Sequence, residues 1–318
     1  METAIAAWEQ HLLRSSKLSA NTITEYIQDI RRFAAWLRDQ ECTATVDDLT
    51  VGDAKAYRDA LLGCGRSPAT INRALTSLAL FCDAAGRLAD NPFRIVDRID
   101  RVEHAPQALN HRAWNAVRRA AEQASRRDHG LTLALVCLMR FAGLRVGEVA
   151  ALEGSDLLLS PRRGTVIVRR GKGLKHREIP LISDARAPLL RYQDHRRQLA
   201  ERWAARALLR HQTPPAWSEW PQGRVFLGQR GPLTERGIRD IVAKIGMAAK
   251  LDAPLSPRDL RHTFATALLD PAAYGIDRPA LPLTAVQDLL GHADPATTAI
   301  YTKAAPSDLA RMLGEAAD

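Results

Sequence analysis

Apolar residues follow a helical period over the first hundred residues of the chain. From Ile23 to Leu37 they recur every three or four positions, and the same spacing returns from Ile71 to Phe81. This period places them on one face of a helix. Ser19 precedes the first pattern, Ser67-Pro68 precedes the second, and Thr50 opens a further helix. These residue types are typical of helix starts. With a segment around residues 2–14, the pattern predicts four helices.

A polar stretch follows this helical region. We expect Asn91-Pro92 to end the fourth helix, because the residue before a proline is biased away from the helical conformation. The stretch from Arg98 to Gln107 is mostly polar and is typical of a linker. The organisation that follows is a helical domain over 1–100, a linker over 101–108 and a second domain over 109–318.

The second domain is predicted to be mostly helical with one small sheet. Residues 164–170 and 175–180 are short β-like runs around a Gly-Lys-Gly-Leu turn, a hairpin signature, and Arg224–Leu227 is expected to add a short strand. Helical patterns cover the remaining segments: 110–127, 131–142, 184–209, 235–249, 257–269, 284–290, 295–304 and 307–315. The fold class is therefore mainly α with a small antiparallel β-sheet (α+β). The role of a loop over 213–223, with several prolines and two tryptophans, does not follow from its sequence.

The charge of the chain points to a polyanionic partner. The 318 residues carry a net charge of +9, and the pI is about 9.8. Residues 1–105 hold 13 Lys and Arg against 15 Asp and Glu, so their net charge is −2 and the rest of the chain carries +11. A solvated basic surface would give the same total, but the excess clusters beside the motifs described below, which favours DNA.

Cysteine spacing and hydropathy exclude several other classes of protein. Cys42, Cys64, Cys82 and Cys137 show no paired spacing, so we expect neither a zinc site nor disulfides, but buried thiols of a reduced cytosolic protein. The N-terminus lacks a signal-peptide pattern, and the longest apolar run, 131–139, is too short to span a bilayer.

Several motifs carry residues suited to phosphate chemistry. In chain order they are Gly143-Leu144-Arg145 with Glu148, Gly171-Lys172-Gly173, Arg258-Asp259-Leu260-Arg261-His262, Leu290-Gly291-His292 and Tyr301. Breaking a phosphodiester without a metal requires charge neutralisation, an in-line nucleophile and a proton for the leaving oxygen. Arginine suits the first task, because its guanidinium is always charged and matches phosphate oxygens. Arg145 and Arg261 are the candidates. Glu148 is placed to hold Arg145, although these two residues alone would fit an ordinary surface pair.

In this order and at these separations the motifs resemble those of the tyrosine recombinases, the phage-integrase and Xer-type enzymes. The resemblance implies a core-binding helical domain before a catalytic domain, and double-stranded DNA with a specific core site as partner. It also implies a homotetramer or paired related recombinases on two synapsed sites, and no cofactor or metal. Two departures stand out: the family usually has His where this chain has Arg258, and the Pro-rich stretch 270–282 is longer than the usual turn.

The resemblance also assigns roles to the remaining residues. Lys172 is the expected general acid for the leaving 5′ oxygen, with Lys175 as the near alternative. A lysine can give up its proton there more readily than an arginine. Tyr301 is the expected nucleophile, and His292 is expected to hydrogen-bond the phosphate or the attacking oxygen. His262 is expected to give structural support, and Arg258 to contact the phosphate or the DNA backbone.

We therefore expect a site-specific recombinase or integrase that cleaves and rejoins DNA through a covalent 3′-phosphotyrosyl intermediate, with the movement of a mobile element as one use of this activity. We expect it in the bacterial cytoplasm, at the nucleoid when bound to DNA. Two alternatives stay open. One is an inactive DNA-binding protein on the same scaffold, motivated by Arg258, and the other is a nicking-closing enzyme similar to type IB topoisomerases. The DNA target and the biological role do not follow from the sequence.

Overall fold

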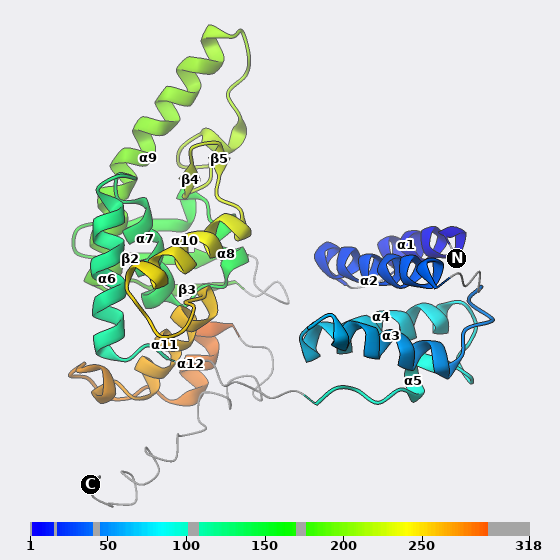
Figure 1. The fold of residues 1–318 in the computed structure, drawn as a ribbon. Coiled ribbons are helices and arrows are strands. Elements are labelled where there is room, and N and C mark those ends of the chain that lie inside the picture. Colours follow the sequence, from blue (N-terminus) through cyan, green and yellow to red (C-terminus); the bar gives the residue numbers. More distant parts are fainter. Residues whose placement is uncertain (1, 16–17, 41–44, 101–107, 170–175, 292–318) are drawn as a thin grey trace, which may run out of the picture. The chain divides into compact units, whose positions relative to one another are not determined.

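The computed structural model describes residues 2–15, 18–40, 45–100, 108–169 and 176–291. The chain divides into two compact units, residues 1–104 (unit 1) and residues 105–318 (unit 2), which are described separately (Figure 1). Most of the predicted linker 101–108 lies outside the described residues, so its exact bounds stay a prediction. No described helix is both long enough and apolar enough to cross a bilayer.

Unit 1 consists of the four predicted helices and one additional short helix. They are α1 (Glu2–Ser15), α2 (Ala20–Asp39), α3 (Val51–Gly63), α4 (Pro68–Ala84) and α5 (Pro92–Ile95). The expected caps form: the side chains of Ser19, Thr50 and Ser67 each accept a hydrogen bond from a backbone N–H of the first turn. Phe33 lies at the centre of the core, with its ring against those of Tyr57 and Phe93.

The expectation for Asn91-Pro92 is wrong. Helix α4 already ends at Ala84, and Asn91 instead begins α5, because its side chain accepts a hydrogen bond from the N–H of Phe93. Asn is favourable before a helix because its side chain can accept such a hydrogen bond. Pro is favourable as the first helical residue because it lacks an N–H that would have no partner there. The first residues of the expected polar stretch also pack on unit 1, where Arg98 donates to the carbonyl of Asn72.

Unit 2 is built around one helix that is buried on all sides. Its helices are α6 (His111–Ser125), α7 (Leu131–Ala142), α8 (Val146–Ala151), α9 (Ser183–Leu209), α10 (Glu235–Ala248), α11 (Pro257–Leu269) and α12 (Leu283–Leu290), with short 3-10 turns η1 (Gly154–Asp156), η2 (Ala216–Ser218) and η3 (Ala272–Tyr274). Every residue of α7 except Phe141 is buried, as expected for a helix that is apolar around its whole circumference. It packs against α6, α9 and α11.

A three-stranded antiparallel sheet supplies the predicted hairpin. Strand β1 (Leu157–Leu159) pairs with β2 (Gly164–Val168), which pairs with β3 (Arg177–Pro180). Val166 lies opposite Ile179, and both are buried. Strand β1 was not predicted. The expected strand over 224–227 is largely displaced, because β4 (Leu227–Gly228) pairs with β5 (Gly231–Pro232) and Arg224 forms only an isolated bridge with Glu153.

The loop with two tryptophans is held on α9 by a buried arginine. Arg196 has no exposed surface and donates to the carbonyls of Trp217, Ser218 and Arg224. Its guanidinium also lies over the ring of Trp220, 5.4 Å from the centroid. The loop is therefore an ordered part of unit 2.

A second buried arginine anchors the longer stretch 270–282. The guanidinium of Arg140 lies 5.1 to 5.7 Å from the ring centroids of Trp114, Phe141 and Tyr274. Burial lowers its pKa to about 10. Tyr274 belongs to η3, so this cation–π contact ties the stretch to α6 and α7.

The expectation of buried thiols is correct for two of the three described cysteines. Cys82 and Cys137 are buried, and burial raises the pKa of each thiol to about 12. Cys64 is exposed, because it follows the last residue of α3 in a turn on the surface. Cys42 lies outside the described residues.

Candidate active site

The turn between α7 and α8 leads to Arg145, which is partly buried. Helix α7 ends at Ala142 and is followed by Gly143, whose φ is 59°. A Cβ at this position would lie 2.2 Å from the ring of Phe264 on α11, so only glycine fits so close to that helix. The turn leaves Arg145 as the residue that begins α8.

Glu148 holds Arg145 as predicted from their spacing. The backbone N–H of Arg145 donates to Oε2 of Glu148 at 2.8 Å, and its Nη1 donates to Oε1 at 3.0 Å. The carboxylate therefore fixes both the start of α8 and the direction of the side chain.

Arg177 joins the same carboxylate and was not predicted. Its Nη1 and Nη2 donate to the two oxygens of Glu148, at 3.0 and 2.7 Å, which is a bidentate pair. Arg177 is 8% exposed. Burial alone would raise the pKa of Glu148, but the hydrogen bonds and charge of Arg177, together with Arg145, outweigh it and lower that pKa. Glu148 is thus ionised between two guanidinium groups.

Three arginines donate hydrogen bonds to three successive carbonyls at the end of α12, one arginine to each carbonyl. Arg177 Nε donates to Leu289 at 2.9 Å, Arg261 Nη2 to Leu290 at 2.7 Å and Arg145 Nη2 to Gly291 at 3.1 Å. The last carbonyls of a helix have no partner within it and carry partial negative charge. These three donors therefore satisfy the end of α12 and fix its position.

Gly291 ends α12 as the sequence predicts. Its φ is 64°, the left-handed conformation that glycine adopts readily. A Cβ at this position would lie 2.9 Å from Nη1 of Arg177. The glycine thus permits both the turn and the close approach of the guanidinium.

Helix α11 carries three of the predicted residues. It begins with a capping box between Ser256 and Asp259. Arg261 is 6% exposed and also donates to the carbonyl of Gly143, which links α11 to the turn before Arg145. His262 is buried, and burial lowers its pKa to about 4 with a further contribution from Arg258. The imidazole is therefore uncharged near neutral pH, and its support role stays a prediction.

Arg258 lies apart from the arginines at the end of α12. It is exposed in the first turn of α11. Arg261 follows three residues later, which places the two side chains on neighbouring parts of the helix surface. The structure thus leaves Arg258 accessible to a partner from solvent, while Arg261 is held inside.

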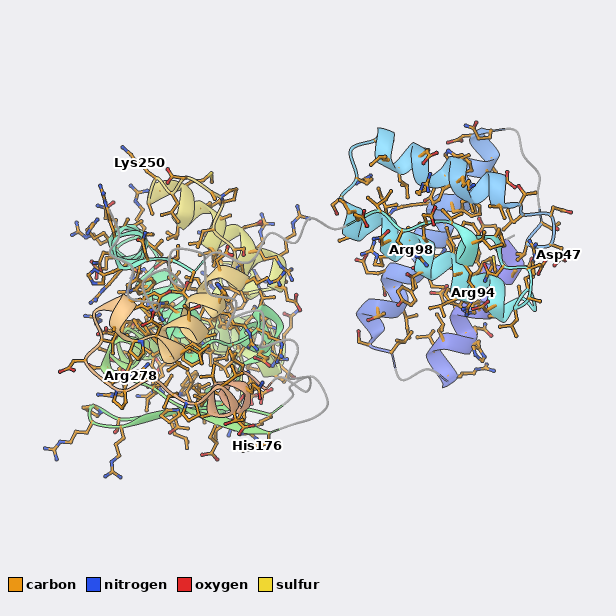
Figure 2. The ribbon with its side chains drawn as sticks, turned by 90° about the horizontal axis from the view of Figure 1, so that it is seen from below. Asp47, Arg94, Arg98, His176, Lys250 and Arg278 are labelled. Carbon is orange, nitrogen blue, oxygen red and sulfur yellow. The ribbon has the colours of Figure 1, made fainter. Side chains whose placement is uncertain are left out.

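Lys172, His292 and Tyr301 lie outside the described residues, as do Lys175 and the two predicted C-terminal helices. Their roles stay predictions. Figure 2 labels His176, where the described chain resumes after the turn that contains Lys172. His292 follows directly after Gly291 in the sequence. The described network thus borders on each of these segments.

A signal for Arg177 was present in the sequence. Alternate residues of a strand face the same side, so Arg177 shares a face with Ile179, which is in the core. A charged side chain on the buried face of a strand is rarely left without a partner. The missing information was which group that partner is, because it comes from another part of the chain. Among the described residues, no three His, Cys, Asp or Glu side chains are grouped as a metal site would require.

Models of two protein families match the chain in the same order as the two units. The model described as the phage integrase family covers residues 109–308, and that of the phage integrase N-terminal SAM-like domain covers residues 5–87. The chain belongs to the phage integrase family. This confirms the resemblance to tyrosine recombinases and the fold class inferred from the sequence, and it makes the protein a tyrosine site-specific recombinase by family.

Relatives and solved structures of this family match nearly the whole chain. Tyrosine recombinase XerC of Methylobacterium sp. (strain 4-46) is 33% identical, over 98% of this chain and 90% of the relative. XerC of Bacillus subtilis (strain 168) is 31% identical, over 92% and 89%. The Tn1549 transposon integrase in complex with transposon right end DNA has a TM-score of 0.68 at 19% identity, over 98% of each chain. A lambda integrase tetramer bound to a Holliday junction has a TM-score of 0.66 at 17% identity, over 94% of this chain and 76% of that one.

Proposed function

We propose that the protein cleaves and rejoins DNA at a specific core site, with Tyr301 as nucleophile and Arg145, Arg258 and Arg261 on the phosphate. The observation that carries the proposal is the convergence of Arg145 and Arg261 at the end of α12. Each donates to one of two adjacent carbonyls there, directly before the position of His292 in the sequence. Arg145 and Arg261, which belong to motifs far apart in the sequence, thus both reach the end of α12 at Leu290 and Gly291.

The proposed reaction is a pair of transesterifications. The phenolic oxygen of Tyr301 attacks the phosphorus while its proton passes to His292 or to water, the bond to the 5′ oxygen breaks, and Lys172 gives that oxygen a proton. The product is a 3′-phosphotyrosyl bond with a free 5′ hydroxyl. Attack by an incoming 5′ hydroxyl reverses the step on a new partner strand. The energy of the broken phosphodiester is kept in the covalent intermediate, so ligation requires no nucleotide cofactor.

The arginine network supplies a positive site that is already organised. A guanidinium carries five N–H donors, and the side-chain hydrogen bonds of Arg145 to Glu148 and Gly291 involve its Nη1 and Nη2. Its side chain is 31% exposed, which leaves it accessible to a phosphate oxygen. Glu148 and Arg177 hold the group in place before the substrate arrives, and such preorganisation lowers the cost of stabilising charge in the transition state.

The solved relatives suggest how the protein works on DNA. The named structures include an integrase on transposon end DNA and an integrase tetramer on a Holliday junction. We propose that this protein likewise assembles as a tetramer on two DNA sites, in the cytoplasm of a bacterium. A role in the movement of a mobile element is one proposed use of the reaction.

A trapping experiment tests the proposal. The core site is first selected from a random DNA pool by the full-length protein, and a nicked duplex of that site is then incubated with it. We expect an SDS-stable protein–DNA adduct, which Tyr301→Phe removes while DNA binding is retained. An adduct at the wild-type level in Tyr301→Phe would contradict the assignment of the nucleophile.

The same substrates separate the two alternatives. An inactive DNA-binding protein would give no adduct, and a nicking-closing enzyme would relax supercoiled plasmids without a specific site. Arg258→Ala tests the departure that motivates the first alternative. We expect it to slow single-turnover cleavage more than it weakens binding, and Arg258→His to retain activity. Cleavage at the wild-type rate in Arg258→Ala on saturating DNA would leave that residue a role in binding only.

A further inference from the structure

Helix α9 carries a row of basic side chains that the catalytic proposal does not use. Arg191, His195, Arg202 and Arg206 follow one another at intervals of four, seven and four residues. At 100° per residue these positions fall within about 60° of one another around the helix. We call these four residues the α9 basic stripe. Its three arginines are exposed.

The stripe begins beside the turn between α6 and α7, where His195 stacks on His129, and continues toward the C-terminal part of α9, which extends away from the rest of unit 2 (Figure 1). Another side of the helix is held by the loop that follows it, because Trp203 packs edge-on against Trp217 with ring centroids 5.2 Å apart and Arg196 donates to three carbonyls of that loop. The loop therefore braces α9 and leaves the stripe accessible.

Neighbouring groups add to the positive charge of this surface. The ring of His195 stacks on that of His129, 4.1 Å away, and His129 lies in the turn between α6 and α7 next to the exposed Arg126 and Arg127. Burial, with smaller contributions from His129 and the charge of Arg202, lowers the pKa of His195 against the opposing charge of Asp128. The positive charge of this surface therefore comes from its arginines.

The arginines of the stripe are not ion-paired within the part of unit 2 that the structure describes. None of its arginines forms an ion pair with a carboxylate of the described chain, whereas Arg118 and Arg239 of the same unit each pair with a glutamate one turn away. Arg206 also lines an open hollow of about 600 Å³ between α9 and the following loop. Unpaired, closely spaced cations on an accessible surface favour a polyanionic partner.

We propose that the α9 basic stripe binds the phosphate backbone of duplex DNA outside the core site. The inference rests on the proposed function for the identity of the polyanion. The stripe extends over 16 residues, from Arg191 to Arg206, or about 22 Å of helix, a length over which one DNA strand presents about six phosphates. Contacts of this kind fix position and add affinity without reading sequence.

Salt dependence of DNA binding tests the stripe directly. The test variant carries Arg191→Gln, Arg202→Gln and Arg206→Gln, because glutamine removes the charge and keeps a good helix former. The control carries Arg162→Gln, Arg163→Gln and Arg197→Gln, which removes the same charge. Arg197 lies on the opposite flank of α9, and the other two lie in the turn between β1 and β2, at the end of the sheet opposite the turn that contains Lys172.

The probe is a labelled 40-base-pair duplex of random sequence, titrated with the full-length protein at several NaCl concentrations. We expect the slope of log Kd against log salt to fall by about 3 in the test variant, with binding at least about tenfold weaker at 0.1 M salt. We expect little change in the control. Circular dichroism confirms that both variants are folded.

A slope equal to that of wild type in the folded test variant would overturn the proposal, including the case in which the stripe serves an acidic protein instead. An equal fall in the control would overturn it as well, because the effect would then follow net charge alone. The adduct with a nicked core site is read separately. If the slope falls but wild-type protein forms no adduct, the stripe stands and the catalytic proposal fails.

Discussion

Each unit of the protein contains one buried carboxylate that holds two arginines, and the two sites differ in where those arginines lead. In unit 1, Asp29 on α2 is 1% exposed. It accepts hydrogen bonds from Arg32, from two nitrogens of Arg73 on α4 and from Ser77. In unit 2, Glu148 accepts from Arg145 and Arg177.

The arginines of unit 1 end at the surface, whereas those of unit 2 continue to another element. The side chains of Arg32 and Arg73 are 53% and 35% exposed, so their charges are partly solvated and the site joins only α2 to α4. Arg177 is 8% exposed, and both it and Arg145 go on to the carbonyls of α12. The same ionic pattern thus joins two helices in unit 1, whereas in unit 2 it holds the end of α12.

Removing the carboxylate of unit 2 is expected to have the largest effect. Glu148→Gln leaves Arg177 buried without its ion pair, which should lower the free energy of unfolding by about 3–5 kcal/mol. Because the end of α12 would then shift, cleavage of the nicked core site should fall on the order of 100-fold. Denaturant unfolding and single-turnover cleavage measure the two effects. Glu153→Gln, which breaks an exposed pair with Arg224, is the control and should change stability by less than about 1 kcal/mol.

Removing the carboxylate of unit 1 should separate stability from catalysis. Asp29→Asn should lower the free energy of unfolding by about 1–3 kcal/mol, less than at Glu148 because Arg32 and Arg73 can turn to water. Cleavage per folded molecule should stay near the wild-type rate. A loss of cleavage similar to that in Glu148→Gln would show that the two sites do not differ as proposed.

Gly291→Ala tests the contact between Arg177 and the end of α12. The left-handed φ alone should cost about 1–2 kcal/mol, and the new methyl group would also displace the Arg177 guanidinium. Gly275→Ala is a matched control, since its φ is 65° and no atom lies within 4 Å of the added Cβ. Gly275→Ala should show the cost of the backbone conformation alone by thermal unfolding, Gly291→Ala should lose more stability because Arg177 is displaced, and only Gly291→Ala should slow cleavage. Equal cleavage rates would show that the close approach of Arg177 has no part in catalysis.

The free energy of unfolding should depend on pH through His262. The effect per pH unit should be smaller than that of replacing Glu148. Its pKa is about 4 in the folded protein, against 6.5 for an ordinary histidine. Between these values the unfolded chain binds the proton first, so stability should fall as pH drops below 6.5, by at most about 1.4 kcal/mol per unit. His262→Gln should flatten the curve of unfolding free energy against pH between 6.5 and 4. An unchanged curve would show that His262 titrates normally.

Local signals in the sequence predicted most helices and one contact of the site. Ser19, Thr50 and Ser67 cap their helices with groups three residues away, and Glu148 meets Arg145 within one turn. Such contacts depend on neighbours in the chain, which the sequence displays. The three residues of β1 are too few to show a period, and they become a strand only because β2 lies beside them.

The central part of the network depends on contacts between distant segments. Arg177 lies on β3, Glu148 on α8 and Leu289 on α12, so no window of sequence contains their relation. The alternation of the strand would place Arg177 on the buried face with Ile179, but the identity of its partner is a property of the tertiary structure. The exposed Cys64 is a related case, because its accessibility depends on where α3 ends.

The burial of α7 on every side has a consequence for how unit 2 opens. Because α7 packs against α6, α9 and α11, its backbone amides can meet solvent only when these layers separate together. Hydrogen exchange at those amides should therefore proceed through unfolding of the whole unit rather than local fraying. The exchange rate of α7 then gives a direct measure of the unit's global free energy of unfolding, against which looser segments can be compared.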